Sequence, residues 1–153
     1  MQRILPVLVA LYLGFAPAAG PKPDRRSDLE KMQGTWDRTH LTIGGRLQEE
    51  PPADGKIEIK GTHLQFPTPA DSWTITLDPK RDPKRFDYRG NISFAKDGKF
   101  PSNTDTIYRG IYRLEGDTLT ICSVRNGSEK DRPTKFKSTG GAVWLQVFKR
   151  QRP

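Results

Sequence analysis

The sequence predicts an all-β domain, an antiparallel up-and-down barrel of about eight short strands with a short N-terminal helix. Three observations lead to this prediction. Apolar residues recur mostly at every second position, glycine and proline interrupt the chain at short intervals, and only one short segment has the pattern of a helix. A sandwich of two open sheets would also suit short antiparallel strands, but a helix that can cover one open end favours the barrel.

The first eighteen residues are expected to form a secretory signal peptide. A positive charge precedes an almost unbroken apolar run at residues 4–15, and Ala16-Pro17-Ala18 supplies the small residues of a cleavage site. The run is short for a bilayer span, although an uncleaved anchor is the alternative interpretation. We therefore expect a secreted or periplasmic protein with a signal peptide at 1–18, a flexible tether at 19–27 and a folded domain at 28–150.

One helix is predicted just before the first strand. Ser27 and Glu30 have the spacing of a capping box, with Ser27 as the N-cap and Glu30 reaching back to its amide. The segment is about two turns long, so it needs packing to persist. Gly34 is expected to end it.

Eight or nine segments have the length and alternation of strands. They are residues 35–43, 56–60, 62–66, 72–78, 85–94, 106–114, 118–124, 134–138 and 142–150. The clearest hairpin surrounds Gly116, which can adopt the positive φ that a tight turn requires. Leu114, Leu119 and Ile121 on either side of this turn are predicted core residues.

The last strand has two apolar faces. Val143, Leu145 and Val147 lie on one face and are expected to close the sheet, while Trp144 and Phe148 lie on the other. Because a strand turns alternate side chains to opposite faces, only one of these sets can point into the barrel. The sequence leaves that choice open.

The residues Gly34-x-Trp36 after a short helix, a meander of strands and a final Lys149-Arg150 resemble the lipocalin and lipocalin-like pattern. This resemblance implies that Trp36 closes the base of the barrel. It also implies that a basic residue, Arg150 or Lys149, packs across Trp36 through a cation–π contact. The predicted structural residues are Gly34, Trp36, Gly116 and Arg150.

The sequence is also similar to a narrower family, a small secreted lipocalin-like domain abundant in planctomycete bacteria. The motifs that carry the similarity are MQGTW (32–36), GGRL (44–47), DPKRDPKRFD (78–87), GIYRLEGDTLTIC (110–122), RPTKF (132–136) and VWLQVFKR (143–150). Together they extend over residues 28–150, and the stretch 110–122 is the most specific. The family implies a lipocalin-like fold and brings no activity, cofactor or catalytic residue with it.

Patterns typical of catalysis or metal binding are missing from the sequence. His40 and His63 are the only histidines, Cys122 is the only cysteine, and neither H-x-x-x-H nor C-x-x-C spacing occurs. The G-x-S-x-G, G-x-G-x-x-G and P-loop patterns are missing as well. Cys122 lies in an alternating strand and is interpreted as a small core residue. We expect no enzyme activity, no catalytic residue, no metal and no cofactor.

The favoured function is non-enzymatic binding of a small amphipathic or acidic molecule in the barrel mouth. A barrel of about eight strands is just wide enough to fill with side chains or to hold one small molecule. The predicted ligand-binding residues are Trp73, Tyr88, Tyr108, Arg109, Tyr112 and Arg113. The aromatic rings, with Phe86 and Trp144, would form the wall, and the two arginines would hold an acidic group. A filled barrel without a cavity is the alternative.

The second hypothesis is an interaction module that adheres to an anionic polymer, an anionic surface or a protein partner. The formal net charge is +8, and basic pairs at 80–81 and 84–85 and a basic tail at 149–152 lie beside strands rich in aromatic residues. Acidic residues interrupt the central cluster, and export would remove most nucleic acid from reach. We therefore expect no nucleic-acid partner. We also expect a monomer.

Overall fold

A computed structural model of the chain describes residues 26–48, 55–67, 72–92 and 104–152. Its elements are the helix α1 (Asp28–Met32) and the strands β1 (Gly34–Ile43), β2 (Arg46–Leu47), β3 (Lys56–Lys60), β4 (His63–Gln65), β5 (Ser72–Asp78), β6 (Arg85–Ile92), β7 (Thr104–Glu115), β8 (Thr118–Arg125) and β9 (Val143–Arg150). The predicted signal peptide at 1–18 lies outside the described residues, as does the predicted tether except for Arg26 and Ser27.

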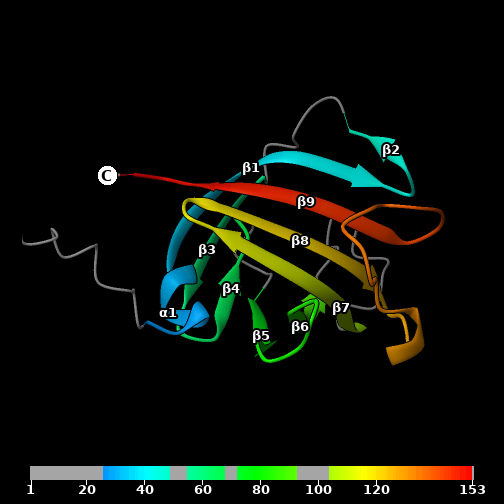
Figure 1. Cartoon of the computed structure of the whole chain (residues 1–153), viewed down its shortest axis with the longest axis horizontal. Coiled ribbons are helices and arrows are strands. Elements are labelled where there is room, and N and C mark those ends of the chain that lie inside the picture. Colours follow the sequence, from blue (N-terminus) through cyan, green and yellow to red (C-terminus); the bar gives the residue numbers. More distant parts are fainter. Residues whose placement is uncertain (1–25, 49–54, 68–71, 93–103, 153) are drawn as a thin grey trace, which may run out of the picture.

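The strands form one closed antiparallel barrel. Each strand of the order β2-β1-β3-β4-β5-β6-β7-β8-β9 pairs with its neighbour, and an additional pairing of β1 with β9 closes the cylinder. Only β2 lies outside this ring, as a short extension on the far end of β1 (Figure 1). The structure therefore confirms the predicted up-and-down lipocalin-like barrel with a short N-terminal helix.

Helix α1 lies across one end of the barrel, which we call the base; the opposite end is the mouth (Figure 1). The predicted capping box is present, since Ser27 Oγ accepts a hydrogen bond from the Glu30 amide at 3.3 Å and the Glu30 carboxylate accepts one from the Ser27 amide at 2.6 Å. Gln33 then joins the helix to the β3–β4 turn, because its side-chain amide bonds both the N–H and the carbonyl of Gly61.

Alternation along the strands directs one set of side chains into the barrel. The buried apolar core comprises Met32, Trp36, Ile57, Ile59, Leu64, Trp73, Ile75, Phe86, Tyr88, Tyr108, Tyr112, Leu119, Ile121 and Phe148. The structure confirms Leu119 and Ile121 as core residues, and Leu114 is half-buried and packs against the core cluster.

The register of β9 identifies its inward face. Phe148 pairs with Leu119 of β8 and is fully buried, and Trp144 packs against the core. The set Val143, Leu145 and Val147, which was expected to close the sheet, is half-buried on the outer face. The barrel thus selects the aromatic face of this strand, because the interior of a small barrel is filled by large side chains.

The segment between β8 and β9, residues 126–142, contains no strand, so the predicted strand at 134–138 is wrong. We call this segment the strap. It holds a short 3-10 helix, η1 (Glu129–Asp131), and lies against the outside of the barrel. Lys135 and Lys137 are exposed and Phe136 is half-buried. Exposure therefore alternates along this segment as it does along a strand, although the backbone forms none.

Arg132 fastens the strap to the outer face of the barrel. Its guanidinium donates to both carboxylate oxygens of Asp87 on β6, at 2.5 and 2.9 Å, and to the carbonyl of Gly110 on β7 at 2.7 Å. The side chain is only 8% exposed, which makes this bidentate pair stronger than a typical surface ion pair. Cys122 is buried as predicted, but it faces outward beneath the strap, where its thiol lies 3.7 Å from the Lys137 carbonyl.

Candidate functional site

The mouth half of the barrel contains a cluster of aromatic side chains. Tyr88 and Tyr108 stack with ring centroids 4.5 Å apart and an interplanar angle of 4°. Trp73 meets both rings edge to face, each at 5.6 Å between centroids. The structure therefore brings together three of the six predicted ligand-binding residues.

The strand register explains this arrangement. Tyr88 of β6 lies directly opposite Tyr108 of β7, and Ile75 of β5 lies opposite Tyr88 on its other side. Trp73 pairs with Gly90, and the missing side chain of that glycine leaves the indole free to lean over the tyrosines. Phe66 and Trp144 flank the cluster at 6.3 Å from Trp73 and 5.8 Å from Tyr108.

Polar side chains share this part of the interior with the aromatic rings. Arg38 of β1 is only 7% exposed, and its Nη1 donates to the side-chain oxygen of Gln146 on β9 at 3.1 Å. The hydroxyls of Tyr88 and Ser123 lie 3.4 Å apart. A barrel filled purely for stability would place apolar groups here, because buried polar groups add stability only when they are paired.

The indole of Trp73 is the polar group that a filled core explains least. Trp73 is 3% exposed, and its Nε1–H has no hydrogen-bond partner among the described residues. An unsatisfied buried donor costs about 1–3 kcal/mol. The donor therefore points to a hydrogen-bond acceptor that the described part of the chain does not supply.

The phenol of Tyr88 is neutral in this environment. Burial raises the pKa of Tyr88 far above its usual value of 10.0, and the contact with Ser123 opposes that shift only in part. The neutral hydroxyl can both donate and accept a hydrogen bond. The Tyr88 hydroxyl is thus a second polar group beside the Trp73 N–H, and its protonation state does not change over the physiological pH range.

The other three predicted ligand-binding residues lie elsewhere. Arg109 and Arg113 alternate with the inward tyrosines of β7 and so point outward, where Arg109 donates to the Gly127 carbonyl and Arg113 lies 5.1 Å from the Phe136 ring. Tyr112 points inward, but toward the base, where its hydroxyl donates to Asp28. The expectation that Arg109 and Arg113 hold an acidic group of a ligand in the barrel mouth is therefore wrong. Among the described residues, Arg38 is an arginine that is buried inside the barrel, and sequence reasoning did not single it out.

The base is closed by the residues that the lipocalin-like resemblance indicated, Trp36 and Arg150. The indole N–H of Trp36 donates to the Met32 carbonyl at 2.8 Å, and the Arg150 guanidinium lies over the Trp36 ring at 4.1 Å from its centroid. Arg150 also donates to the carbonyls of Lys31 and Gln33, so it caps the end of α1. Gly34 has a φ of 112°, which a residue with a side chain adopts only under strain.

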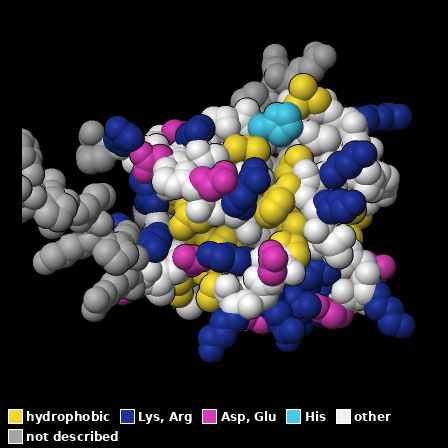
Figure 2. Space-filling model, in the orientation of Figure 1, with side chains coloured by type: hydrophobic (Ala, Val, Ile, Leu, Met, Phe, Trp, Pro, Cys, Tyr) yellow, Lys and Arg dark blue, Asp and Glu magenta, His cyan; other side chains and the backbone are white. Residues whose placement is uncertain are grey.

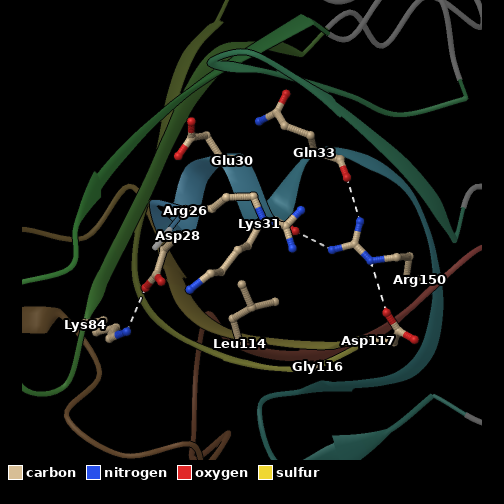
Figure 3. A pocket seen from close by; sticks show the side chains of 10 residues that line it. All are labelled: Arg26, Asp28, Glu30, Lys31, Gln33, Lys84, Leu114, Gly116, Asp117 and Arg150. Atoms are coloured by element: carbon tan, nitrogen blue, oxygen red, sulfur yellow. Dashed lines mark hydrogen bonds and ion pairs between the residues drawn. The ribbon is translucent and has the colours of Figure 1, made fainter. Parts of the chain in front are cut away.

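A hollow of about 770 Å³ lies beside α1 at the base, and Figure 3 shows the side chains that line it. Four of its charged side chains form two ion pairs: Lys84 bonds Asp28 at 2.7 Å, and Arg150 pairs with Asp117 at 3.3 Å. These contacts hold the helix on the barrel. The hollow is therefore interpreted as part of the closed base, and the mouth cluster is the stronger candidate for a ligand site.

The described residues also bear on two other kinds of site. No group of three or more His, Cys, Asp or Glu residues there is arranged to hold a metal ion. In the same part of the chain, every helix is too short or too polar to cross a membrane.

Comparison with family models, with curated proteins and with solved structures gives no match.

Proposed function

We propose that this protein is an exported binding protein without catalytic activity, which holds a small amphipathic molecule in the mouth half of its barrel. The observation that carries the proposal is the buried indole N–H of Trp73, which lacks an acceptor within the described residues and lies among aromatic rings. Binding sites for small molecules combine an apolar wall with a few polar groups that fix the orientation of the ligand.

The geometry favours a ligand with a flat apolar body and one acceptor group. The body would contact the aromatic cluster of Trp73, Tyr88 and Tyr108. The acceptor would take the hydrogen bond from Trp73, and the positive charge of Arg38 in the same part of the interior favours an acidic acceptor over a neutral one.

The proposal can be tested by titration with 8-anilinonaphthalene-1-sulfonate, a flat aromatic anion that becomes fluorescent in apolar surroundings. We expect saturable binding of one probe per chain, with quenching of tryptophan fluorescence. Trp73→Phe keeps an aromatic ring but removes the donor, so it should weaken binding about fivefold to tenfold. Arg113→Gln, on the outer face, is the matched control and should leave the dissociation constant unchanged.

Salt dependence distinguishes the interior from the surface. A probe held inside the barrel should keep most of its affinity between about 0.05 M and about 0.5 M salt, because screening acts mainly on exposed charges. Probe binding that does not saturate would show that the interior is a filled core. Equal affinity in Trp73→Phe and the unaltered protein would show that the Trp73 donor does not hold the probe.

A further inference from the structure

The outer face of the barrel around the strap carries much of the positive charge of the chain. Residues 125–137 contain five basic and two acidic residues, a net charge of +3, and residues 80–89 have the same composition and the same net charge. Arg85, in the second stretch, pairs with Glu129 of the strap at 2.9 Å, so the two stretches lie side by side. Figure 2 shows Lys and Arg side chains along the side of the molecule where Figure 1 places the strap.

A groove runs between these two stretches. It has a volume of about 290 Å³ and lies between residues 81–85 and residues 129–134, with Ile111 and Pro133 among the apolar parts of its lining. Arg81 and Lys130 are exposed on its two sides. The groove is thus open to a chain-like partner and flanked by cations.

The strap lysines are available to such a partner. Lys130, Lys135 and Lys137 are exposed, and none of them forms an ion pair with another described residue. Lysine presents a compact, hydrated charge on a flexible stem, which suits carboxylates or sulfates spaced along a flexible polymer better than a single fixed anion. We refer to these three lysines, with Arg81 and Arg85, as the strap surface.

The chemistry of the strap surface favours an acidic polysaccharide over a nucleic acid. Single-stranded nucleic acids are held by exposed aromatic rings on which the bases stack. Phe136 is the only aromatic residue of the strap, and the guanidinium of Arg113 lies over its ring. The described residues of this face therefore offer no exposed ring on which bases could stack. The positive charge of the face remains and can attract an acidic polymer.

We propose that the strap surface binds an acidic polysaccharide, with the polymer lying along the groove and its carboxylates meeting the strap lysines. This inference is independent of ligand binding inside the barrel, because the strap surface and the mouth cluster lie on opposite faces of the sheet. It adds a second partner, a polymer rather than a small molecule, to the proposed function.

The test is a titration of a fluorescently labelled alginate oligosaccharide, a chain of carboxylated sugars, with the full-length protein at about 0.15 M salt. The variant Lys130→Glu, Lys135→Glu, Lys137→Glu should weaken binding about tenfold or more. The control Arg46→Glu, Lys56→Glu, Lys60→Glu removes the same charge from exposed residues on β2 and β3, and β3 lies opposite β7 in the ring of strands. It should weaken binding by less than about threefold.

Three results would overturn the inference. The two triple variants could lose affinity equally, which would assign binding to the net charge, or the unaltered protein could fail to bind at about 0.15 M salt. Single-stranded oligo-dT of matched length could bind more tightly than alginate, which would indicate a nucleic-acid surface. The corresponding glutamine variants at 130, 135 and 137 repeat the test with a smaller charge change, in case the glutamate variant does not fold.

Discussion

The guanidinium of Arg150 lies over the indole of Trp36, and both side chains donate hydrogen bonds to backbone carbonyls at the end of α1. Trp36 belongs to β1 and Arg150 to β9, and the two residues are directly paired across the seam that closes the barrel. One contact therefore joins the first strand, the last strand and the helix. We expect the base to unfold as a unit when this contact is broken.

Arg150→Lys should lower the free energy of unfolding by about 2–3 kcal/mol, because lysine keeps the charge but cannot bond two carbonyls and cover the indole at once. Urea unfolding, followed by tryptophan fluorescence, measures the change. Arg152→Lys is the control, since Arg152 is 82% exposed and its exchange should cost less than about 0.5 kcal/mol. Equal losses in the two variants would show that Arg150 acts only as a surface charge.

Gly110→Ala should destabilise the barrel by about 2–3 kcal/mol. A Cβ at Gly110 would lie 2.7 Å from the Cys122 carbonyl oxygen and 2.9 Å from the Ser123 Cβ, so the backbones of β7 and β8 would have to separate. Gly61→Ala is the comparison, because a Cβ there meets no atom within 4 Å and only the left-handed φ of 57° costs energy, about 1 kcal/mol. Thermal unfolding of both variants separates crowding from backbone strain.

Asp87→Asn should make the thiol of Cys122 more reactive toward a disulfide reagent such as Ellman's reagent. Cys122 is buried beneath the strap, and burial raises the pKa of its thiol, so little thiolate forms and little reagent reaches it. Loss of the Asp87 carboxylate removes the ion pair that holds Arg132, and the strap should open more often. The rate of labelling at constant pH measures the opening.

Lys130→Gln is the control for this experiment, because Lys130 is exposed on the strap and has no part in the ion pair between Arg132 and Asp87. Its labelling rate should equal that of the unaltered protein. If Asp87→Asn also leaves the rate unchanged, another contact holds the strap over Cys122.

Stability should fall in acid through Asp28. Burial raises the pKa of Asp28, but hydrogen bonds from Lys84 and Tyr112 outweigh it and hold the pKa below the ordinary value of 3.8. The contribution of a carboxylate with a lowered pKa is complete above its unfolded pKa and is lost as the pH falls through the folded pKa. The free energy of unfolding should therefore drop below about pH 4, and Asp28→Asn should flatten that slope. Urea titrations from about pH 6 to about pH 2.5 test this.

Much of the fold was predictable because its local signals agree with its tertiary contacts. The hairpin around Gly116 has alternating side chains on both strands and a glycine with a φ of 55°, as the sequence predicted. The strap was not predictable in the same way. Phe136 lies between two exposed lysines, so the segment has the period of a strand. Its apolar side chain packs on the outside of the barrel. The period alone does not show whether the backbone pairs with a neighbouring strand.

The candidate site was predictable only in part. Trp73, Tyr88 and Tyr108 were identified because large aromatic residues in alternating strands belong inside a small barrel. Strand alternation also places Arg109 on the face opposite to Tyr108, so both could not have lined one cavity. Arg38 could not be identified from the sequence, because a charged residue in an alternating segment is usually exposed and its burial depends on pairing with β9.

The pairing of β1 with β9 brings together residues that are more than one hundred positions apart, such as Trp36 and Arg150. The cylinder therefore cannot close without β9, the last strand of the ring. Contacts of such long range form late in folding. The first and last strands of the ring must therefore both be present before its inner face can be enclosed.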